Sequence, residues 1–525
     1  MGFWRRFFNR KVQVNTGEDV KASKDLEENF RIIKEDFLKD CDDVIYRRLE
    51  IGVWKNYKAA IICLDGMADK NLVNDFALNN LMLTAREVRP EPSTIKKNLY
   101  ELVKSQTLAV AELDEVDTIN DGVIAILSGE TVLLLDGHDK IIIIASKGWP
   151  ARTPEEPDTE TVIRGSRDGM VETSRFNTTL IRRRIRDHRL KLKDFQVGTR
   201  SKTDVSLLYM EDIASPKLVE KVEERLKKVD VDAIIDSGQL EEFIEDKWFS
   251  PFPQIQNTER PDTAASALYH GRVVLVVDNT PFALIVPTTF NIMMQSAEDY
   301  YSRWDIATFI RILRYSCILI ALYSPALYVA LTAFHPQMIP SGLALGILAT
   351  RRDVPFPAVV EAFVMEVTLE ILREAGVRLP GAIGSTIGIV GGLVIGQAAV
   401  EAGVVSPLMV IVVSITAIAT FAIPNYNLAI TIRILRFAML FIAASFGLYG
   451  IMLFTLVILI HLCSLKSFGT PYLTPFVHFF EATGDLKDTI ARAPYVAMHN
   501  RSIFAVKEEK NLMDDHREED FNKEE

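Results

Sequence analysis

The residues best placed to carry chemistry are three glutamates in otherwise apolar sequence, Glu361, Glu366 and Glu370. Their spacings of five and four residues keep them within roughly one face of a helix. Carboxylates near a bilayer are costly and usually face water or an ion path. A ring of such helices would attract cations, so these side chains are a candidate cation path. The alternative is the solvated face of a helix at the membrane interface.

A regular series of glycines follows the glutamates. Gly384, Gly388, Gly392 and Gly396 recur at every fourth position. This spacing removes the side chains from one face of a helix, so that another helix backbone can approach closely. We therefore predict a helix-packing face. Its partner is either a helix of another subunit or a helix of the same chain, and the spacing fits both.

These residues belong to the most apolar part of the chain, which begins near Tyr315. A helix needs ~20 apolar residues to cross a bilayer. Four runs are long enough, and they cover residues 315–334, 383–402, 407–423 and 437–462. Segments 340–350 and 356–372 are predicted to be re-entrant or interfacial helices. The sequence thus predicts an all-α polytopic membrane domain with four or five spans.

The charges before the first span favour one orientation. Arg303, Arg311 and Arg314 precede it, and cytoplasmic loops carry an excess of such cations. We therefore expect the N-terminal region in the cytoplasm. Four spans would place both termini on one side of the membrane, and a fifth would separate them.

The region before the spans is rich in charged residues and shows two similar series of elements. Residues 59–66 are a predicted strand, and 122–146 are predicted to form three strands with turns at Ser128-Gly129 and Asp136-Gly137. Residues 205–212 are again a predicted strand, 215–229 an amphipathic helix, and 267–288 three more strands.

The two series align without gaps. Residues 125–143 match 267–285 at a shift of 142 positions, and 63–73 match 209–219 at a shift of 146. Two nearly equal shifts favour a tandem duplication over chance similarity between apolar strands. We therefore predict an α/β soluble region made of two similar subdomains, each with a sheet faced by helices.

Composition places the boundaries between these parts. We expect a flexible tail at 1–24, subdomain 1 at 25–150, a linker at 151–165, subdomain 2 at 166–298, a membrane domain at 299–470 and a charged C-terminal tail at 471–525.

One irregular segment of subdomain 2, SPFPQIQNTERPD at 250–262, is long enough to suggest a function. The alternative is a long surface loop. The residues of this candidate signal-relay loop are Pro251, Pro253, Gln254, Gln256, Asn257 and Arg260.

Several classes of protein are disfavoured by composition and motifs. The net charge of −11 argues against nucleic-acid binding, which needs a surplus of cations. The four cysteines lack CxxC spacing, and the eight histidines are dispersed, so we expect no disulfide framework, metal site or cofactor. No catalytic or nucleotide-binding motif is present. A channel or receptor component is favoured over a transporter, and an enzyme comes last.

Four segments together resemble one family. They are SPFPQIQNTERPD (250–262), DYYSRW (299–304), VPFPAVVEAFVMEVTLEILREAGVRLP (354–380) and GSTIGIVGGLVIGQAAVEAGVVSP (384–407). These strings closely resemble the A subunits of bacterial spore germinant receptors, the GerA family. One departure is the stretch 165–169, GSRDG, where the family usually has a proline after the first glycine and then a Glu-Gly pair.

The resemblance implies a place and a set of partners. Proteins of this family lie in the inner membrane of dormant endospores. They act with a transporter-like B subunit that binds the nutrient and with a lipoprotein C subunit. Nutrient binding leads to release of monovalent cations and then to germination. The A subunits are thought to assemble into an oligomeric channel, a pentamer by resemblance.

Two other functions stay open. The chain could be a scaffold and signal relay that conducts nothing itself. It could also be a germination channel that amplifies the signal without a nutrient-binding partner of its own.

Overall fold

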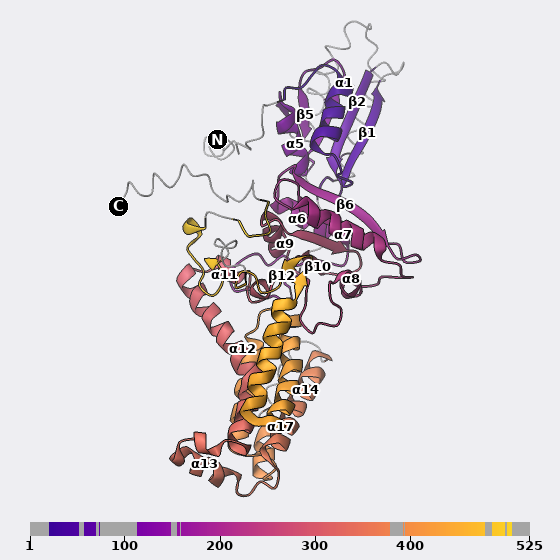
Figure 1. The fold of residues 1–525 in the computed structure, drawn as a ribbon. Coiled ribbons are helices and arrows are strands. Elements are labelled where there is room, and N and C mark those ends of the chain that lie inside the picture. Colours follow the sequence, from indigo (N-terminus) through magenta and orange to yellow (C-terminus); the bar gives the residue numbers. More distant parts are fainter. Residues whose placement is uncertain are drawn as a thin grey trace, which may run out of the picture.

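The structure is a computed structural model, drawn in Figure 1. It describes residues 20–51, 57–69, 73, 113–146, 148, 155–157, 159–378, 392, 394–477, 486–498 and 501–506. Two antiparallel sheets form the soluble end of the molecule, and a bundle of helices forms the other end. The predicted fold class, with two similar sheet-and-helix units before an all-α region, is confirmed.

Subdomain 1 is built on a five-stranded sheet with the order β1-β2-β4-β5-β3. Its strands are β1 (Val44–Ile51), β2 (Tyr57–Leu64), β3 (Leu113–Val116), β4 (Thr131–Leu135) and β5 (Ile141–Ile144). One face is covered by α1 (Leu26–Arg31), the π-helix η2 (Ile32–Phe37) and α5 (Ile119–Leu127). The alternate apolar residues of the strands pack against these helices because successive strand side chains point to opposite faces.

Subdomain 2 repeats this plan with the order β6-β7-β9-β10-β8. Its strands are β6 (Leu190–Val197), β7 (Thr203–Met210), β8 (Gln256–Thr258), β9 (Val273–Val277) and β10 (Ala283–Val286). Helices α6 (Ser174–Arg184) and α9 (Pro261–Tyr269) cover one face. Helices α7 (Pro216–Lys228) and α8 (Ser237–Ile244) cover the other. The strand at 205–212 and the amphipathic helix at 215–229 are confirmed.

The repeat extends to the pairing of individual residues. Val44 pairs with Leu64 in subdomain 1, and Leu190 pairs with Met210 in subdomain 2, each 146 positions later. Helix α5 and strands β4 and β5 recur as α9, β9 and β10 at a shift of 142 positions. The predicted shifts therefore describe two copies of one unit with the same strand order and register.

The first predicted strand of each triplet is wrong, because both are helices, α5 and α9. Short apolar runs do not distinguish a buried strand from a buried helix. Thr118 caps α5 by accepting a hydrogen bond from the N–H of Asp121. Gly129 ends it with a φ of +88°, a conformation that glycine adopts without strain. The predicted turn at Asp136-Gly137 is confirmed between β4 and β5.

The second half of the chain is helical. After α10 (Phe290–Met293) and α11 (Glu298–Tyr301) come α12 (Trp304–Ala333), the 3₁₀ turn η5 (Pro336–Met338), α13 (Ser341–Arg351), α14 (Ala358–Arg378), α16 (Pro407–Phe421) and α17 (Tyr426–Ser464). Among the described residues, α12 and α17 are long and apolar enough to cross a membrane. Figure 1 shows α12, α14 and α17 side by side, with α13 at the end farthest from the sheets.

Helix α17 folds back on itself at Gly447, where φ is 58° and ψ is −142°. Thr431, before this residue, donates a hydrogen bond to the carbonyl of Pro251. His461, after it, lies 2.9 Å from the hydroxyl of Ser250. Thirty residues of straight helix would separate Thr431 from His461 by about 45 Å. The predicted single span at 437–462 is therefore wrong, because it crosses the turn between two antiparallel halves, 426–446 and 448–464.

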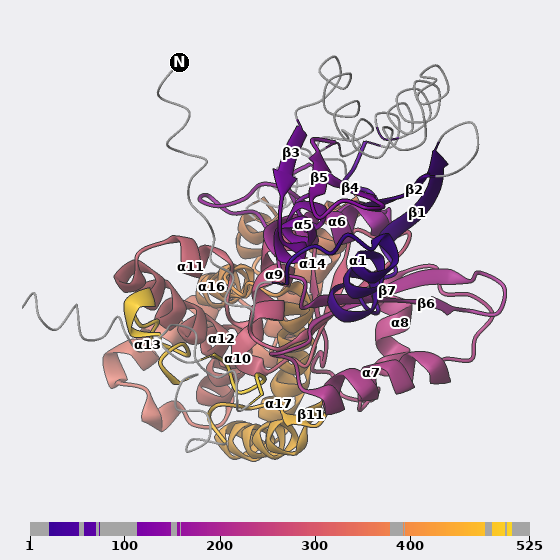
Figure 2. The ribbon, with the colours of Figure 1, turned by 90° about the horizontal axis from the view of Figure 1, so that it is seen from above.

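The chain then returns to the soluble end. Strands β11 (Lys466–Ser467) and β12 (Thr470–Pro471) form a small hairpin, followed by the 3₁₀ turn η6 (Tyr495–Ala497). Phe468 enters the core of subdomain 2, and Val506 donates its N–H to the carbonyl of Ile213. Figure 2, seen from above, shows the described C-terminal residues in yellow beside α10 and α12. They therefore join both parts of the molecule.

Candidate functional site in the helical bundle and its junction

Glu361 lies near the start of α14 and points into the bundle. Its side chain is buried, with Oε1 3.0 Å from Nη2 of Arg351, the last residue of α13. Oε2 accepts the backbone N–H of Ser406 at 2.8 Å, just before α16 begins. The carboxylate therefore links three helices at the end of the bundle far from the sheets.

Glu366 and Glu370 lie about one and a half and two and a half turns further along α14, opposite the first half of α17. Oε2 of Glu366 is 2.7 Å from Nη2 of Arg436. Oε2 of Glu370 accepts a hydrogen bond from Nη1 of Arg433 at 2.9 Å, and its Oε1 lies 3.4 Å from both Arg436 and Arg373. Glu366 is buried, whereas Glu370 is half-buried.

All three candidate glutamates thus have arginine partners inside one chain. In the sequence, nothing marks the arginines at 351, 433 and 436 as partners of these glutamates. Their separation from the glutamates by up to 70 residues gave no local sign of pairing. Ions buried in an apolar bundle are stable only when they are paired, which accounts for the close contacts. A cation path along α14 stays a prediction, and it requires these pairs to separate.

The glycine series is described only in part, because Gly384 and Gly388 lie outside the described residues. A Cβ atom at Gly396 would lie 3.3 Å from Cγ1 of Val410 on α16, a close approach within the same chain. A Cβ atom at Gly392 would meet none of the described residues within 4 Å. The two positions differ, so both predicted partners of this face stay open.

The segment 250–262 joins subdomain 2 to the bundle. The side chain of Gln254 closes a loop by donating to the carbonyl of Lys247 at 2.7 Å and accepting its N–H at 2.9 Å. Its own carbonyl accepts a hydrogen bond from the hydroxyl of Ser467 at 2.6 Å. The contacts of Pro251 and Ser250 with α17 lie at the tip of this loop.

Part of this segment is regular, so the predicted loop is shorter than expected. Gln256 and Asn257 belong to β8, and α9 begins at Pro261. The sequence pattern does not predict the edge strand β8, because it has only three residues and none of them is strongly apolar. Pro253 is buried, and Gln256 accepts a hydrogen bond from Arg272 at 2.8 Å.

Arg260 fastens the end of the segment to the linker. Its buried guanidinium forms two bonds with Asp262, at 3.0 and 2.7 Å. It also donates to the carbonyl of Glu160 in the linker at 3.1 Å and to the carbonyl of Ser166 at 2.7 Å. Ser166 follows Gly165, whose φ is +141° and whose Cβ position would lie 2.6 Å from the ring of Tyr301. The stretch 165–169, in which this chain departs from the family pattern, is therefore tightly packed.

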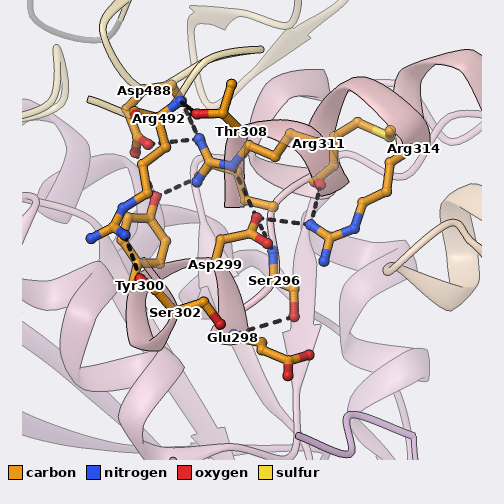
Figure 3. A network of polar contacts seen from close by, with 12 residues as sticks. Ser296, Glu298, Asp299, Tyr300, Ser302, Thr308, Arg311, Arg314, Asp488 and Arg492 are labelled. Atoms are coloured by element: carbon orange, nitrogen blue, oxygen red, sulfur yellow. Dashed lines mark hydrogen bonds and ion pairs between the residues drawn. The ribbon is translucent and has the colours of Figure 1, made fainter. Parts of the chain in front are cut away.

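A network of charged residues forms the junction between the soluble region and α12 (Figure 3). Asp299 of α11 accepts hydrogen bonds from Arg311 at 2.9 Å and from Arg314 at 2.8 Å. Arg311 also donates to Asp488 at 2.7 Å, and Tyr300 donates its hydroxyl to the same carboxylate. Asp488 belongs to the C-terminal segment, 177 positions after Arg311, so two distant parts of the chain meet here.

The junction also bears on the predicted orientation. Arg311 and Arg314 are buried and neutralised by carboxylates, so they do not act as free interfacial cations. Of the three arginines, Arg303 alone has an exposed side chain, 3.6 Å from Asp305. A cytoplasmic N-terminal region stays a prediction with a weaker basis.

A cavity of about 520 Å³ adjoins the junction, lined by Tyr300 and Asp488 and by His270 and Arg272 of subdomain 2. Removal from water lowers the pKa of His270 to about 4 and that of Arg272 to about 9. The guanidinium of Arg272 donates to the carbonyl of Pro287 at 2.8 Å. Among the described residues, no group of His, Cys, Asp or Glu side chains is arranged to hold a metal ion.

Comparison with known proteins gives a consistent result. The Bacillus/Clostridium GerA spore germination protein family matches residues 31–504. Spore germination protein A1 of Bacillus subtilis (strain 168) is 46% identical over 459 residues, 87% of this chain and 92% of the relative. The membrane protein YfkQ of the same organism is 42% identical over 489 residues, 93% of each chain.

One solved structure is also similar. It is the crystal structure of the N-terminal domain of the A subunit of the Bacillus megaterium spore germinant receptor GerK3. It is 29% identical, covers 52% of this chain and 98% of that chain, and has a TM-score of 0.41.

Proposed function

Because the chain belongs to the Bacillus/Clostridium GerA family of spore germination proteins, we propose that it is the A subunit of a nutrient germinant receptor. A role in spore germination follows from the family itself. In the proposal the protein lies in the spore inner membrane, forms an oligomeric channel for monovalent cations, and opens when a partner B subunit senses a nutrient.

The observation that carries the channel proposal is the row of ion pairs between α14 and its neighbours. Ionised side chains are rare within apolar bundles and usually mark ion or proton pathways. In the arrangement described, Glu366 and Glu370 are held by Arg433 and Arg436. We therefore assign this arrangement to a closed channel. Opening would move α14 away from α17 and leave carboxylates free to attract cations.

In this proposal, a conformational signal passes from subdomain 2 to these ion pairs through a continuous series of contacts. The loop closed by Gln254 touches both halves of α17, through Pro251 and Ser250. Asp299 fixes the start of α12. A movement of subdomain 2 would therefore pull on α12 and α17 together, and α17 carries the arginines that hold α14.

The test is potassium flux through liposomes that contain the full-length protein, with and without co-purified partner subunits. Reversing the charge of Glu361, Glu366 and Glu370 is expected to lower the flux severalfold. Because buried lysines disturb folding, Glu370→Gln serves as a milder variant. Arg433→Gln removes the closest cation beside Glu370 and is expected to raise the flux. Arg303→Gln is the control, since this exposed side chain lies outside the bundle. Flux and selectivity unchanged in all these variants would reject the pore assignment.

A non-conducting relay is the second candidate, and it is favoured by the completeness of the pairing inside one chain. It predicts that Asp299→Asn abolishes germination, although the purified protein never conducts. A third candidate is a channel that amplifies the signal without its own nutrient-binding partner. Genes for B and C subunits next to the gene for this chain would argue against that candidate.

A further inference from the structure

Two large aromatic side chains are exposed to solvent at the end of subdomain 2 that faces the bundle. Trp248 and Phe249 are 81% and 84% exposed, and their rings pack edge to face with centroids 5.7 Å apart. Phe243 of α8 is exposed as well. Rings of this size are normally buried, so an exposed pair in mutual contact marks an interaction surface.

The loop that carries the two rings is held in place. The amide of Gln254 bridges both backbone groups of Lys247, directly before Trp248. Directly after Phe249, Ser250 contacts His461, and Phe252 is buried in the core of the bundle. The aromatic pair therefore projects from a rigid support, and its exposure does not arise from a loose loop.

The position of the loop is set by its contacts with α17. The ammonium group of Lys247 lies 3.5 Å from the carbonyl of Ser464, the last residue of that helix. Leu459 and Ile460, one turn earlier, are exposed apolar side chains on the outside of the bundle. Figure 1 shows α8 just above the level at which the helices meet the soluble region. The aromatic pair thus lies where the apolar surface of α17 ends.

We propose that Trp248 and Phe249 form an anchor that inserts into the headgroup region of the lipid bilayer and holds subdomain 2 against the membrane. An indole has an apolar ring and one N–H donor, which suits the boundary between acyl chains and headgroups. Lys247 beside it can reach lipid phosphates while its carbon chain stays in apolar surroundings. This proposal requires only that the helices lie in a bilayer. A test of the anchor is therefore independent of whether the protein conducts ions.

Lipid fits the surface better than a second protein chain. The two rings are more than 80% exposed, so they protrude from the loop that carries them. The neighbouring exposed surface is the apolar outside of the second half of α17, which includes Leu459 and Ile460. A bilayer that covers Leu459 and Ile460 would reach the aromatic pair without any further movement.

The test measures the depth of Trp248 by fluorescence quenching in the full-length protein. The chain contains five tryptophans, so the signal of Trp248 is the difference between the wild type and Trp248→Phe. Both proteins are placed in phosphatidylcholine–phosphatidylglycerol liposomes that carry a doxyl quencher at carbon 5 or at carbon 12 of the acyl chain. Equal melting temperatures of the two proteins establish that the substitution leaves the fold intact.

The expected result is a difference signal quenched at least twofold more by the shallow quencher than by the deep one, and only weakly by aqueous iodide. Strong quenching by iodide with none by the lipid quenchers would overturn the anchor and leave the rings in water. Protection from iodide and from both lipid quenchers would overturn it in favour of a protein partner. In a second experiment Phe249→Ser is compared with Trp248→Phe/Phe249→Ser. The difference, which isolates Trp248, is expected to show more iodide quenching than in the wild type, because the ring packed against the indole is removed.

Discussion

Arg436 of α17 holds Glu366 of α14 inside the bundle, with Nη2 and Oε2 2.7 Å apart and side chains 3% and 1% exposed. The two residues are 70 positions apart in sequence. Their contact connects α14, which carries the candidate cation path, to α17. Helix α17 in turn touches subdomain 2 near both of its ends. The predictions below test this connection and the interactions that support it.

The first prediction concerns the Glu366–Arg436 pair itself. Glu366→Gln or Arg436→Met alone leaves a buried charge without its closest partner, which costs about 3–5 kcal/mol. The double variant Glu366→Gln/Arg436→Met removes both charges and is expected to cost much less than the sum. Thermal unfolding in detergent measures the four proteins of this cycle. Lys228→Ala, at an exposed pair with Glu224, is the control and should change little. Additive effects in the cycle would contradict a direct pair.

A second prediction concerns the contact between the two subdomains. Arg182 of α6 donates two hydrogen bonds to Asp43, at 2.7 and 3.1 Å, and both side chains are buried. Asp43→Asn leaves Arg182 charged without a counter-ion and is expected to cost about 3–5 kcal/mol. Native-state hydrogen exchange of the full chain should show faster exchange in β1 and α6. Arg48→Ala, at an exposed pair with Glu27, is the matched control.

The third prediction concerns the turn in α17. A Cβ atom at Gly447 would lie 2.9 Å from Cε1 of His335 and 3.0 Å from the side chain of Phe334. The backbone at this position is also nearly closed to residues other than glycine. Gly447→Ala is therefore expected to cost on the order of 3 kcal/mol. Melting temperature and the yield of monodisperse protein measure the loss.

The control for this turn is Gly346→Ala in α13, where a Cβ atom would meet nothing within 4 Å. Alanine is the better helix former, so this variant should be neutral or more stable by up to about 1 kcal/mol. Equal stability of the two variants would mean that α17 does not reverse at residue 447.

The fourth prediction concerns pH. Burial lowers the pKa of His270 to about 4, with Arg272 and Arg501 acting in the same direction and Asp488 opposing them. Between about pH 6.5 and pH 4 the unfolded chain binds a proton at this residue that the folded chain does not. The free energy of unfolding therefore falls as pH decreases through this range, by up to about 3 kcal/mol.

The check is the pH dependence of unfolding in the wild type and in His270→Gln. The variant is expected to lose this part of the dependence, whereas His138→Gln, in the β4–β5 turn, should keep it. A wild-type slope that persists in His270→Gln would assign the effect to other groups.

Local patterns in the sequence were sufficient for much of the fold. The division between soluble and membrane parts follows from composition, because apolar runs of about 20 residues have no other common use. The repeat was visible at shifts of 142 and 146 positions because each copy keeps the same apolar residues at the same strand positions. The four segments that resemble the GerA family were also enough to indicate the family.

Other features depend on residues that meet only after folding. The segments that became α5 and α9 contain short apolar runs that fit either a strand or a helix, and packing against the sheet decides between them. Gly447 is one glycine among many in apolar sequence, and only the folded structure identifies the turn, through its backbone angles and its neighbours at the end of α12.

The surroundings of the three glutamates also depend on residues that meet only after folding. Helical spacing placed Glu361, Glu366 and Glu370 on roughly one face of α14, and it gave no information on what that face meets. The tertiary structure turns this face toward Arg351, Arg433 and Arg436. A buried carboxylate is stable only beside a counter-charge, and that counter-charge is brought by helices distant in sequence. The sequence by itself thus determined which residues carry the charge, and the packing of the helices decided which partners hold it.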